Sequence, residues 1–357
     1  MRMSWRQSLV QACTIIAGPA FRGVHAIRGA AYKSGLFHSY EADVPVISVG
    51  NLAIGGTGKT PLVIWLAARL SSLGILPAVA SRGYRGTNKE PYLVASDGTG
   101  GSPLHGPSVV GDEPYLIACR LPTVPVLVGR KRMHPLKAAQ DLFAIDVILL
   151  DDGFQHLAAA RDLDLVVLTG SEDHMLPFIQ LREPLSALGR AHAFLLQRPK
   201  DATDHPQWLP KHLPTFYWRL GASSLLNSPF PFEAVNIAEL ANKKVTLASA
   251  IARPERFLAT AKKLGWNVAS HVTFRDHHFF TERELQRLLS DNTASEIVFT
   301  EKDWVKLPRW FQGHERTWAL RIDVVVEEEE AFLHFVTQRI GRKVREGSPA
   351  SVCSRQQ

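Results

Sequence analysis

Short apolar runs recur along the first 200 residues of the chain, and segments with helical periodicity lie between them. The apolar runs begin at residues 44, 77, 124, 146, 163 and 193, and the helical intervals cover 61–73, 113–121 and 130–143. This alternation is typical of a parallel sheet with helices packed on it, whose ligands bind at the carboxyl ends of the strands. We therefore predict a doubly wound α/β domain over residues 41–200.

The segment after this domain, residues 199–214, is rich in Pro, His and Lys, and we predict a domain boundary there. Further apolar runs and helical intervals follow from residue 245 onward. They predict a second, smaller α/β domain over residues 215–342. Residues 343–357 are predicted to form a flexible tail.

The first 40 residues contain no acidic residue, and their five basic residues are Arg2, Arg6, Arg22, Arg28 and Lys33. The uncharged stretch from Gln7 to Phe21 is 15 residues long and is interrupted by Gly18 and Pro19. That is shorter than the ~20 residues needed to cross a bilayer, so we do not expect a transmembrane helix. Residues 1–40 are predicted to be a basic amphipathic lead. Such a lead either docks on an anionic membrane surface or packs on the protein's own core.

Composition places the chain among ordinary globular proteins. Of its 357 residues, 45% are apolar and 21% are charged, unlike disordered chains or integral membrane bundles. The three cysteines stand far apart, so neither a disulfide framework nor a zinc site is predicted, and a reducing, cytoplasmic setting fits best. The net charge of +7 is modest. We predict no nucleic-acid partner and no obligate protein partner.

The segment from Val44 to Pro61, VPVISVGNLAIGGTGKTP, joins a buried strand to a helix through a glycine-rich turn. In this arrangement main-chain N–H groups face one anion at a helix N-terminus, which is how P-loop proteins hold phosphates. Lys59 is predicted to reach the β- and γ-phosphates, and Thr60 to place its hydroxyl on Mg²⁺. The strict pattern has Gly where this chain has Ala53, so an incidental glycine-rich turn is the alternative. The predicted nucleotide-binding residues are Gly55, Gly56, Thr57, Gly58, Lys59 and Thr60.

The run DVILLDDGFQH at 146–156 ends an apolar strand in two carboxylates. Side chains alternate along a strand, so Asp151 and Asp152 are expected to point to opposite sides, and only one contacts Mg²⁺ directly unless the strand has already ended. Gln155 and His156 follow on the exit loop and could position a phosphate. The alternative is a common Asp-Asp-Gly turn without a metal.

Further charged residues follow other strands or begin helices. Asp112 and Glu113 stand at a helix start, where capping is the ordinary role of an acid. Arg82, Arg85 and Arg182, the last with Glu183, are candidates for contacts to an anionic substrate, although a solvated surface arginine is the better explanation for any one of them taken singly. His277, in FRDHHFF, is a candidate general base, and a packed core histidine is its alternative.

Seven motifs occur in one order: GNLAIGGTGKTP, SRGYRG, GDEP, DDGFQH, LREPLSALGRA, FRDHH and FTEKD. From about Arg22 to Arg342 the chain resembles the tetraacyldisaccharide 4′-kinase family of the lipid A pathway, in which Ala53 is no exception. The resemblance implies a P-loop NTPase-like fold and a peripheral enzyme on the cytoplasmic face of the bacterial inner membrane. It implies transfer of the ATP γ-phosphate to the 4′-hydroxyl of an acylated glucosamine disaccharide 1-phosphate, forming lipid IVA.

The resemblance also assigns roles to residues of this chain. Asp112 is expected to pair with His277 as the catalytic base, with Lys59 as a further catalytic residue. Because Asp112 falls in the first predicted domain and His277 in the second, domain closure is expected to assemble the base. The expected metal site contains Thr60, Asp151, Asp152 and Glu113, and the expected substrate contacts are Arg82, Arg85, Gln155, Arg182 and Glu183. The cofactors implied are ATP and Mg²⁺.

Two other classes compete with a lipid kinase. A GTPase switch usually needs an [NT]-K-x-D loop, and here Thr300-Glu301-Lys302-Asp303 has its lysine one place late. A non-catalytic nucleotide-binding scaffold is disfavoured by the surplus of carboxylates and by His277. Acyl-chain preference, oligomeric state and the choice between Asp151 and Asp152 as the direct metal ligand stay open.

Overall fold

The computed structural model describes residues 5–175, 180–198 and 206–347, and these group into two compact units. Unit 1 comprises Met1–Arg82, Lys131–Arg219 and Val326–Gln357, whereas unit 2 comprises Gly83–Arg130 and Leu220–Val325. Both units are therefore assembled from separate stretches of sequence. The continuous domains predicted over 41–200 and 215–342 stay predictions.

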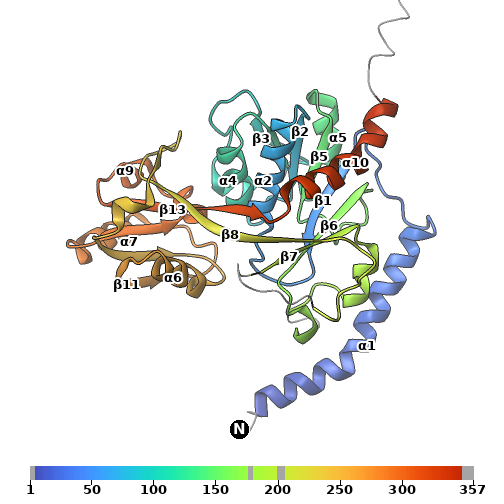
Figure 1. Ribbon diagram of the computed structural model, residues 1–357, viewed down its shortest axis with the longest axis horizontal. Coiled ribbons are helices and arrows are strands. Elements are labelled where there is room, and N and C mark those ends of the chain that lie inside the picture. Colours follow the sequence, from blue (N-terminus) through green and yellow to red (C-terminus); the bar gives the residue numbers. More distant parts are fainter. Residues whose placement is uncertain (1–4, 176–179, 199–205, 348–357) are drawn as a thin grey trace, which may run out of the picture. The chain divides into compact units, whose positions relative to one another are not determined.

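The centre of unit 1 is a parallel sheet. Its strands are β1 (Val46–Asn51), β2 (Pro77–Ser81), β5 (Val147–Asp151), β6 (Leu163–Leu168), β7 (Ala193–Gln197) and the first part of β8 (Thr215–Leu226). β1 lies between β5 and β6 (Figure 1), with Val49 opposite Asp151 on one side and Leu165 on the other. Every residue of these three strands is buried, as expected for parallel strands covered on both faces. The predicted parallel α/β class is confirmed.

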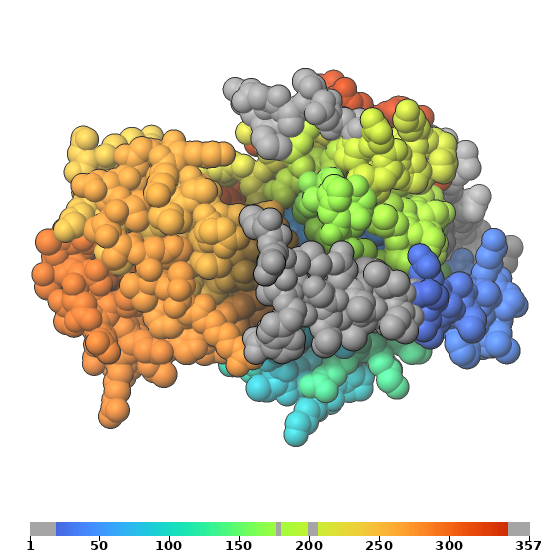
Figure 2. All heavy atoms as spheres, turned by 90° about the horizontal axis from the view of Figure 1, so that it is seen from below, coloured from blue at the N-terminus to red at the C-terminus, as the bar shows by residue number. Residues whose placement is uncertain are grey.

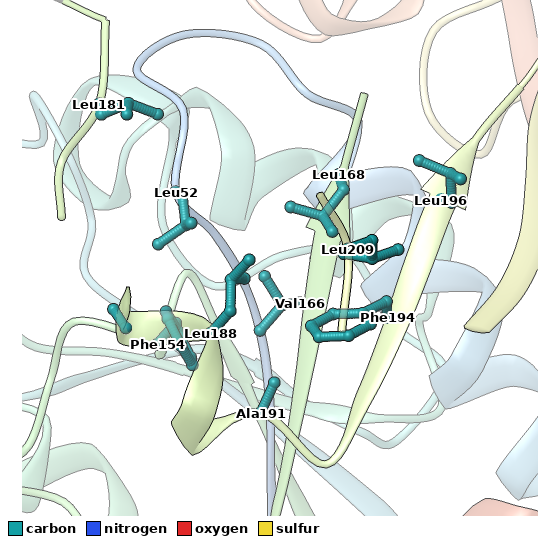
Figure 3. Packing of buried hydrophobic residues seen from close by; sticks show 11 residues of the cluster. Leu52, Phe154, Val166, Leu168, Leu181, Leu188, Ala191, Phe194, Leu196 and Leu209 are labelled. Carbon is teal, nitrogen blue, oxygen red and sulfur yellow. The ribbon is translucent and has the colours of Figure 1, made fainter. Parts of the chain in front are cut away.

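Helices and short 3₁₀ segments cover the two faces of this sheet. They are α2 (Lys59–Ser72), α5 (Met133–Leu142), α10 (Glu329–Gly347), η1 (Glu172–His174) and η2 (Leu185–Arg190). Trp65 of α2 stacks on Phe332 of α10 at a centroid distance of 5.9 Å, so these two helices share one face. On another side of the strands, Phe154, Leu188 and Phe194 join a fully apolar cluster with residues of β6 (Figure 3). The cluster anchors the residues that follow β5, which belong to the candidate site.

The N-terminal helix α1 (Trp5–Lys33) continues through Pro19, so the interruption expected there does not end the helix. A proline removes one main-chain donor, and an exposed helix tolerates that loss better than a buried one. From residue 19 onward, where its side chains are described, α1 forms part of the blue surface in Figure 2. Phe21 is buried, whereas Val24 and Ile27 are 64% and 73% exposed. In the described ranges no helix combines the length and the hydropathy needed to cross a membrane.

Unit 2 contains a second parallel arrangement in the order β11, β10, β12 and β13. The bounds are β10 (Lys244–Ser249), β11 (Asn267–Thr273), β12 (Glu296–Thr300), β13 (Thr317–Val326), α6 (Pro254–Lys263), α7 (Glu282–Asp291), α8 (Glu301–Trp304) and α9 (Arg309–Gln312). A short strand β9 (Ala234–Val235) and a 3₁₀ turn η3 (Ile237–Leu240) precede them. Two apolar cores lie on these strands, one around Trp266 and Trp318 and one around Trp304 and Phe311.

The earlier part of unit 2 positions an acidic helix start. It contains β3 (Leu93–Asp97), β4 (Pro125–Val128), α3 (Pro107–Val110) and α4 (Asp112–Arg120), and β3 pairs with β4 in antiparallel fashion. Arg120, in the last turn of α4, donates a hydrogen bond to Glu301 at the start of α8, and both residues are largely buried. This ion pair holds the two helices together. At the end of the chain α10 includes residues 343–347 of the predicted tail, and residues 348–357 lie outside the described part.

Candidate active site

The glycine-rich turn connects the carboxyl end of β1 to the start of α2, as the sequence predicts. α2 begins at Lys59, and Gly58 before it has a φ of 86°. A Cβ at Gly58 would stand 2.5 Å from the ring of Trp218, which is fully buried. Both the backbone angle and the close ring require glycine. The first N–H groups of a helix have no acceptor within it, so this turn presents donors suited to an anion.

Lys59 lies among oxygen atoms at the end of the sheet. Its Nζ is 3.1 Å from Asn51 Oδ1 and 3.4 Å from Asp152 Oδ1. Arg182 donates a hydrogen bond to the other carboxylate oxygen of Asp152. Burial alone would raise the pKa of Asp152, but the charges of Lys59 and Arg182 lower it to about 2. Asp152 is therefore ionised at neutral pH and faces the phosphate-loop lysine.

Asp151 and Asp152 have different surroundings because the strand ends between them. β5 stops at Asp151, and Asp152 has a φ of 56°, in the left-handed region. Asp151 accepts a hydrogen bond from Ser81 Oγ at 3.1 Å, on the neighbouring strand β2. Of the two, Asp152 is the carboxylate beside Lys59. The choice between them as the direct metal ligand stays a prediction.

Arg132 is a residue of this region that sequence reasoning missed. Its side chain is 4% exposed, and Nη2 donates a hydrogen bond to the main-chain oxygen of Asp151 at 2.8 Å. Burial lowers its pKa to about 10, so it is still charged at neutral pH. Burial also lowers the pKa of His156 to about 4, with Arg132 and Arg82 adding to that effect. His156 is therefore neutral at pH 7. The basic run GRKR directly after an apolar strand was the available sign of Arg132.

Arg182 reaches Asp152 because its segment pairs with the phosphate loop. Ala53 and Leu181 form an antiparallel bridge, and the N–H of Arg182 donates to the oxygen of Leu52 at 2.7 Å. Glu183, next in the chain, is 1% exposed and accepts a hydrogen bond from Arg190. Gln155 donates from Nε2 to the main-chain oxygen of Asn51 at 2.8 Å. Gln155 and Arg182 of unit 1 therefore contact the loop, whereas Glu183 faces Arg190 and His25.

Unit 2 contains the other half of the predicted chemistry. His277 Nδ1 lies 2.7 Å from Asp112 Oδ2, and both side chains are largely buried. Burial alone would raise the pKa of Asp112, but the hydrogen bond to His277 and the charges of Lys302 and Lys306 lower it overall. The carboxylate therefore stays ionised and orients the imidazole through Nδ1. The other ring nitrogen, Nε2, does not contact Asp112 and has Asp276 Oδ2 at 3.6 Å and Lys302 Nζ at 3.5 Å.

The expected assembly of this pair by domain closure is wrong for these two residues. Asp112 and His277 lie in the same compact unit, because residues 83–130 group with unit 2. The glycine of the GDEP motif explains the geometry of the helix start. Gly111 has a φ of 93°, and a Cβ there would stand 2.7 Å from the main-chain oxygen of Tyr84.

Lys302 and Tyr84 also contact the pair, and neither was proposed for the site from the sequence. Lys302 Nζ lies 3.1 Å from Glu113 Oε1 and 3.5 Å from His277 Nε2. Burial alone would lower the pKa of Lys302, but Glu113 and Asp112 raise it overall. Tyr84 packs edge-on against the His277 ring at 5.6 Å. Both residues lie in motifs that the sequence analysis recognised, FTEKD and SRGYRG. The motifs did not reveal that these two side chains contact His277.

Three non-glycine residues of the described part have φ in the left-handed region: Arg85, Asp152 and His277. All three were singled out from the sequence as site residues. Such angles cost a non-glycine residue free energy and persist where the surroundings fix them, which is common at functional sites. Arg85 also donates to the main-chain oxygen of Asp276 at 2.8 Å, which ties the SRGYRG loop to the FRDHH loop within unit 2.

The phosphate loop after a central parallel strand, with its lysine beside an aspartate, defines the class of protein: a P-loop fold of the nucleotide-dependent kinase type. Comparison with known proteins then gives the family. The family model described as tetraacyldisaccharide-1-P 4′-kinase matches residues 11–341. The chain belongs to this family and is a kinase, as the resemblance predicted.

Individual relatives agree with this assignment. The chain is similar to the tetraacyldisaccharide 4′-kinase of Anaeromyxobacter sp. (strain K), with 40% identity over 85% of this chain and 84% of the relative. It is 35% identical to that of Chlorobaculum tepidum over 80% of this chain and 83% of the relative. It is also similar to a crystal structure of "apo" form LpxK from Aquifex aeolicus in complex with ATP. The TM-score is 0.78 and the identity 31%, covering 93% of this chain and 99% of the other. The predicted P-loop NTPase-like fold is confirmed.

Proposed function

We propose that this protein transfers the γ-phosphate of ATP to the 4′-hydroxyl of a tetraacyldisaccharide 1-phosphate, forming lipid IVA. The observation that carries this proposal is the phosphate loop of unit 1, whose lysine lies beside Asp152, in a chain that belongs to the 4′-kinase family. In the proposed reaction unit 1 binds the nucleotide and unit 2 supplies the base.

In unit 1, Lys59 and the N–H groups of Gly55 to Thr60 neutralise and align the β- and γ-phosphates. Phosphoryl transfer asks a protein mainly for positioning and charge neutralisation, because the transition state spreads negative charge over the phosphoryl oxygens. Lys59 is held between Asp152 Oδ1 at 3.4 Å and Asn51 Oδ1 at 3.1 Å, at the end of the loop whose N–H groups are proposed to bind the phosphates.

The residues present fit Mg²⁺ as the metal. In the described ranges there is no group of three or more His, Cys, Asp or Glu side chains that could hold a metal. Mg²⁺ does not require one, because it is usually held by one or two carboxylates, waters and the substrate phosphates. Asp152 Oδ1 is buried without a hydrogen-bond partner, although Lys59 lies near it. Thr60, Asp152 and Asp151 of unit 1 are the proposed ligands, and the bound metal would neutralise phosphate charge. Glu113, the fourth predicted ligand, belongs to unit 2, where Lys302 Nζ lies 3.1 Å from its Oε1.

In unit 2, His277 acts as the general base that Asp112 orients. With its Nδ1 proton donated to Asp112, the imidazole offers the Nε2 lone pair to the 4′-hydroxyl of the acceptor. The hydroxyl proton moves to Nε2 as the oxygen attacks the γ-phosphorus, and ADP leaves. A positioned base of this kind typically accelerates a reaction about 10²–10⁴-fold.

The substrate is an amphiphile, and several features of unit 1 suit one. Arg82, Gln155, Arg182 and Glu183 of unit 1 are proposed polar contacts to the disaccharide phosphate, and Arg85 of unit 2 is a further proposed contact. A cavity of about 530 Å³ lies between α1 and η2, lined by small and apolar side chains together with His25, Lys33 and Arg190. Its mixed lining supports binding of a molecule that carries both acyl chains and an anionic group.

We also propose that the protein is peripheral on the cytoplasmic face of the inner membrane, with α1 as its docking element. One face of α1 packs on unit 1 through Phe21 and through Arg28, which donates to the main-chain oxygen of Gln155 at 3.1 Å. Val24 and Ile27 of the same helix are exposed. Exposed apolar residues beside basic ones favour an anionic bilayer surface. Packing on the protein's own core and docking on a membrane, the two alternatives left open by the sequence, are therefore compatible in one helix.

The direct test supplies purified protein with ATP, Mg²⁺ and detergent-dispersed tetraacyldisaccharide 1-phosphate. The expected product carries phosphate at the 4′-position, detected by mass spectrometry and phosphorus NMR. GTP in place of ATP is the comparison that separates a kinase from a GTPase switch. Nucleotide hydrolysis that is indifferent to the lipid, or product formed equally without nucleotide, would contradict the proposal.

A further inference from the structure

We propose that Asn51 is the positioning residue of the phosphate loop, a role that rests on the proposed binding of ATP there. Its side chain fixes the start of the loop, the middle of the loop and the loop lysine at the same time. Asn51 is the last residue of β1 and is fully buried. It is therefore part of the rigid strand, whereas the groups it holds belong to the turn.

The side-chain amide of Asn51 makes three hydrogen bonds. Nδ2 donates to the main-chain oxygen of Ala53 at 2.6 Å and to Thr57 Oγ1 at 2.8 Å, and Oδ1 accepts from Lys59 Nζ at 3.1 Å. These bonds also decide the orientation of the amide. If it were turned over, its NH₂ group would face the lysine ammonium, and its oxygen would face the carbonyl of Ala53. Both donors and the acceptor of the amide are thus used.

The main chain of the same residue is held as well. The oxygen of Asn51 accepts a hydrogen bond from Gln155 Nε2 at 2.8 Å. Residues 52–54 pair with 180–182, with the N–H of Ile54 donating to Gln180 at 2.7 Å. The support of the loop is therefore continuous from β1 into the turn. Asn51 therefore holds the proposed phosphate-binding groups in a fixed position relative to the sheet.

This arrangement explains how the loop does without the first glycine of the strict pattern. Ala53, which occupies that place, is 1% exposed, and Asn51 holds its carbonyl directly. The left-handed backbone angles of the turn fall instead at Gly55 and Gly58. The side chain of Asn51 thus fixes the entry to the turn, and the glycines are needed only where the chain reverses.

Asparagine also fits the charge of the site. Lys59 already has one carboxylate neighbour, Asp152, and Asn51 gives it a neutral acceptor on another side. An aspartate at position 51 would keep an oxygen for Lys59 but would add a buried negative charge where the polyphosphate binds. The amide directs the lysine without competing with the phosphates. This difference between a neutral and a charged acceptor makes the inference testable.

The experiment compares Asn51→Leu and Asn51→Asp with the wild-type protein in ATP titration calorimetry and in steady-state kinetics. Asn51→Leu keeps the approximate volume and removes all three hydrogen bonds. We expect ATP affinity to fall about 10- to 100-fold and kcat to fall with it, because a misplaced phosphate lysine loses transition-state contacts. The KM for the lipid should change less than about twofold, since the side chain of Asn51 bonds only to loop residues, and the main-chain bond to Gln155 remains in the variant. Asn236→Ala, which removes another asparagine that bonds its own turn, is the control and should leave both constants unchanged.

A double-mutant cycle shows whether Asn51 acts through Lys59. With Lys59→Met in the background, Asn51→Leu should weaken ATP binding by clearly less than it does alone, because part of its effect has already been removed. Full additivity would contradict that route. Asn51→Asp should weaken ATP binding at least about tenfold even when it folds as well as the wild type.

The outcomes separate this inference from the proposed function. If the wild-type protein binds no ATP, the proposed function fails. If it binds ATP and Asn51→Leu, folded by circular dichroism, binds it equally well with the same kcat, only the role of Asn51 is overturned. The same holds if Asn51→Leu lowers the melting temperature alone. Should the leucine variant fail to fold, unchanged ATP affinity in Asn51→Asp overturns the role instead.

Discussion

The two halves of the predicted chemistry are built in opposite ways. The candidate phosphate site of unit 1 lies at the ends of strands. The adjacent strands β1 and β5 position Asn51, Lys59 and Asp152, and the sheet fixes these two strands side by side. The base of unit 2 joins the start of a helix to a loop 165 residues further along the chain. The first kind of site is a local sequence pattern. The second exists only after folding, and for this reason its parts resemble ordinary caps and core histidines in the sequence.

The charged groups around the acid also differ between the two sites. In unit 1 an acid is surrounded by cations, and Lys59 and Arg182 lower the pKa of Asp152 to about 2 against the effect of burial. In the proposed function these cations have a second task, which is to contact phosphate groups. In unit 2 the pKa of Asp112 is lowered, against the effect of burial, by the hydrogen bond to His277 and by two lysines. That acid has one task, which is to orient a base. We therefore expect substitutions in unit 1 to affect nucleotide binding, and substitutions in unit 2 to affect the chemical step.

The largest expected effect belongs to Lys59. Lys59→Ala should lower kcat by about a thousandfold or more, because it removes the charge that neutralises the transferring phosphoryl group. Product formation from ATP and the acylated disaccharide measures it, with ATP affinity determined separately by calorimetry. Lys137→Ala, an exposed lysine on α5 of the same unit, is the control and should leave kcat unchanged. A Lys59→Ala enzyme with more than a tenth of the wild-type kcat would contradict this role.

Substitution of His277 sharpens the contrast between the units. His277→Ala should lower kcat about 10²–10⁴-fold while the KM for ATP changes little, since a base contributes in the transition state and not to nucleotide binding. Asp112→Asn should lower kcat as well, and the double variant should be little worse than His277→Ala, because the two residues act as one unit. Steady-state kinetics with both substrates varied gives these constants.

The neighbouring histidine provides a matched control for that experiment. His278 points to Glu284, with Nε2 at 3.0 Å from Oε2, and stacks on Phe274. His278→Ala therefore removes an imidazole from the same loop without touching Asp112. Its kcat should stay within about tenfold of the wild type. Equal losses in the two histidine variants would show that the loop conformation, and not a base at His277, limits the rate.

The helix proposed to dock on the membrane, α1, gives a smaller expected effect, on localisation. Replacing Val24 and Ile27 together by serine should weaken binding to anionic liposomes by about tenfold or more, because two apolar side chains that enter the bilayer interface contribute well over 1 kcal/mol. Vesicle sedimentation measures the partitioning, and deletion of residues 1–21 should weaken it further. In detergent, where the lipid is already dispersed, the kcat of the serine variant should match the wild type. Undiminished liposome binding by both variants would place the docking surface elsewhere.

The sequence predicted the parts of the fold that depend on continuous local patterns. Strands β1, β5, β6 and β7 fall within two residues of the expected apolar runs, because fully buried parallel strands consist almost entirely of such residues. β3 was missed, since only two of its five residues are buried and its pairing is antiparallel. β8 was missed because buried and partly exposed residues mix along its 12 positions. Both depend on partners that local periodicity does not reveal.

The same distinction holds for the site residues. Lys59 and Asp152 followed from motifs at strand ends, whereas Arg132, Lys302 and Asn51 were not assigned to the site. Arg132 and Lys302 reach it through tertiary contacts with Asp151 and His277. Asn51 belongs to the recognised motif GNLAIGGTGKTP. Its role could not be predicted, because it depends on three hydrogen-bond partners that only the folded structure identifies. Conversely, the arrangement by which Asp112 and His277 share one unit could not follow from a division of the chain into consecutive domains.

The smallest expected effect concerns the helix that follows the His277 loop. α7 begins with a capping box, in which Thr281 Oγ1 accepts from the N–H of Glu284 and the Glu284 carboxylate accepts from the N–H of Thr281. These bonds, with the one from His278, lower the pKa of Glu284 from 4.5 to about 2. Because the folded-state pKa is the lower one, this stabilisation is fully present above pH 4.5 and is lost as the pH falls toward 2.

Glu284→Gln should therefore lower the free energy of unfolding by about 1 kcal/mol or less at pH 7, since the carboxylate is partly exposed, and by progressively less below pH 4.5. Urea unfolding of the whole chain at several pH values measures the difference. Glu282→Gln, in the same first turn but outside the box, controls for the loss of one negative charge near the helix N-terminus. If both variants lose stability equally, the charge matters and the box does not. If Glu284→Gln also lowers kcat at neutral pH, the capping box of α7 influences His277 through His278. The stability of that loop and the chemical step would then depend on the same contacts.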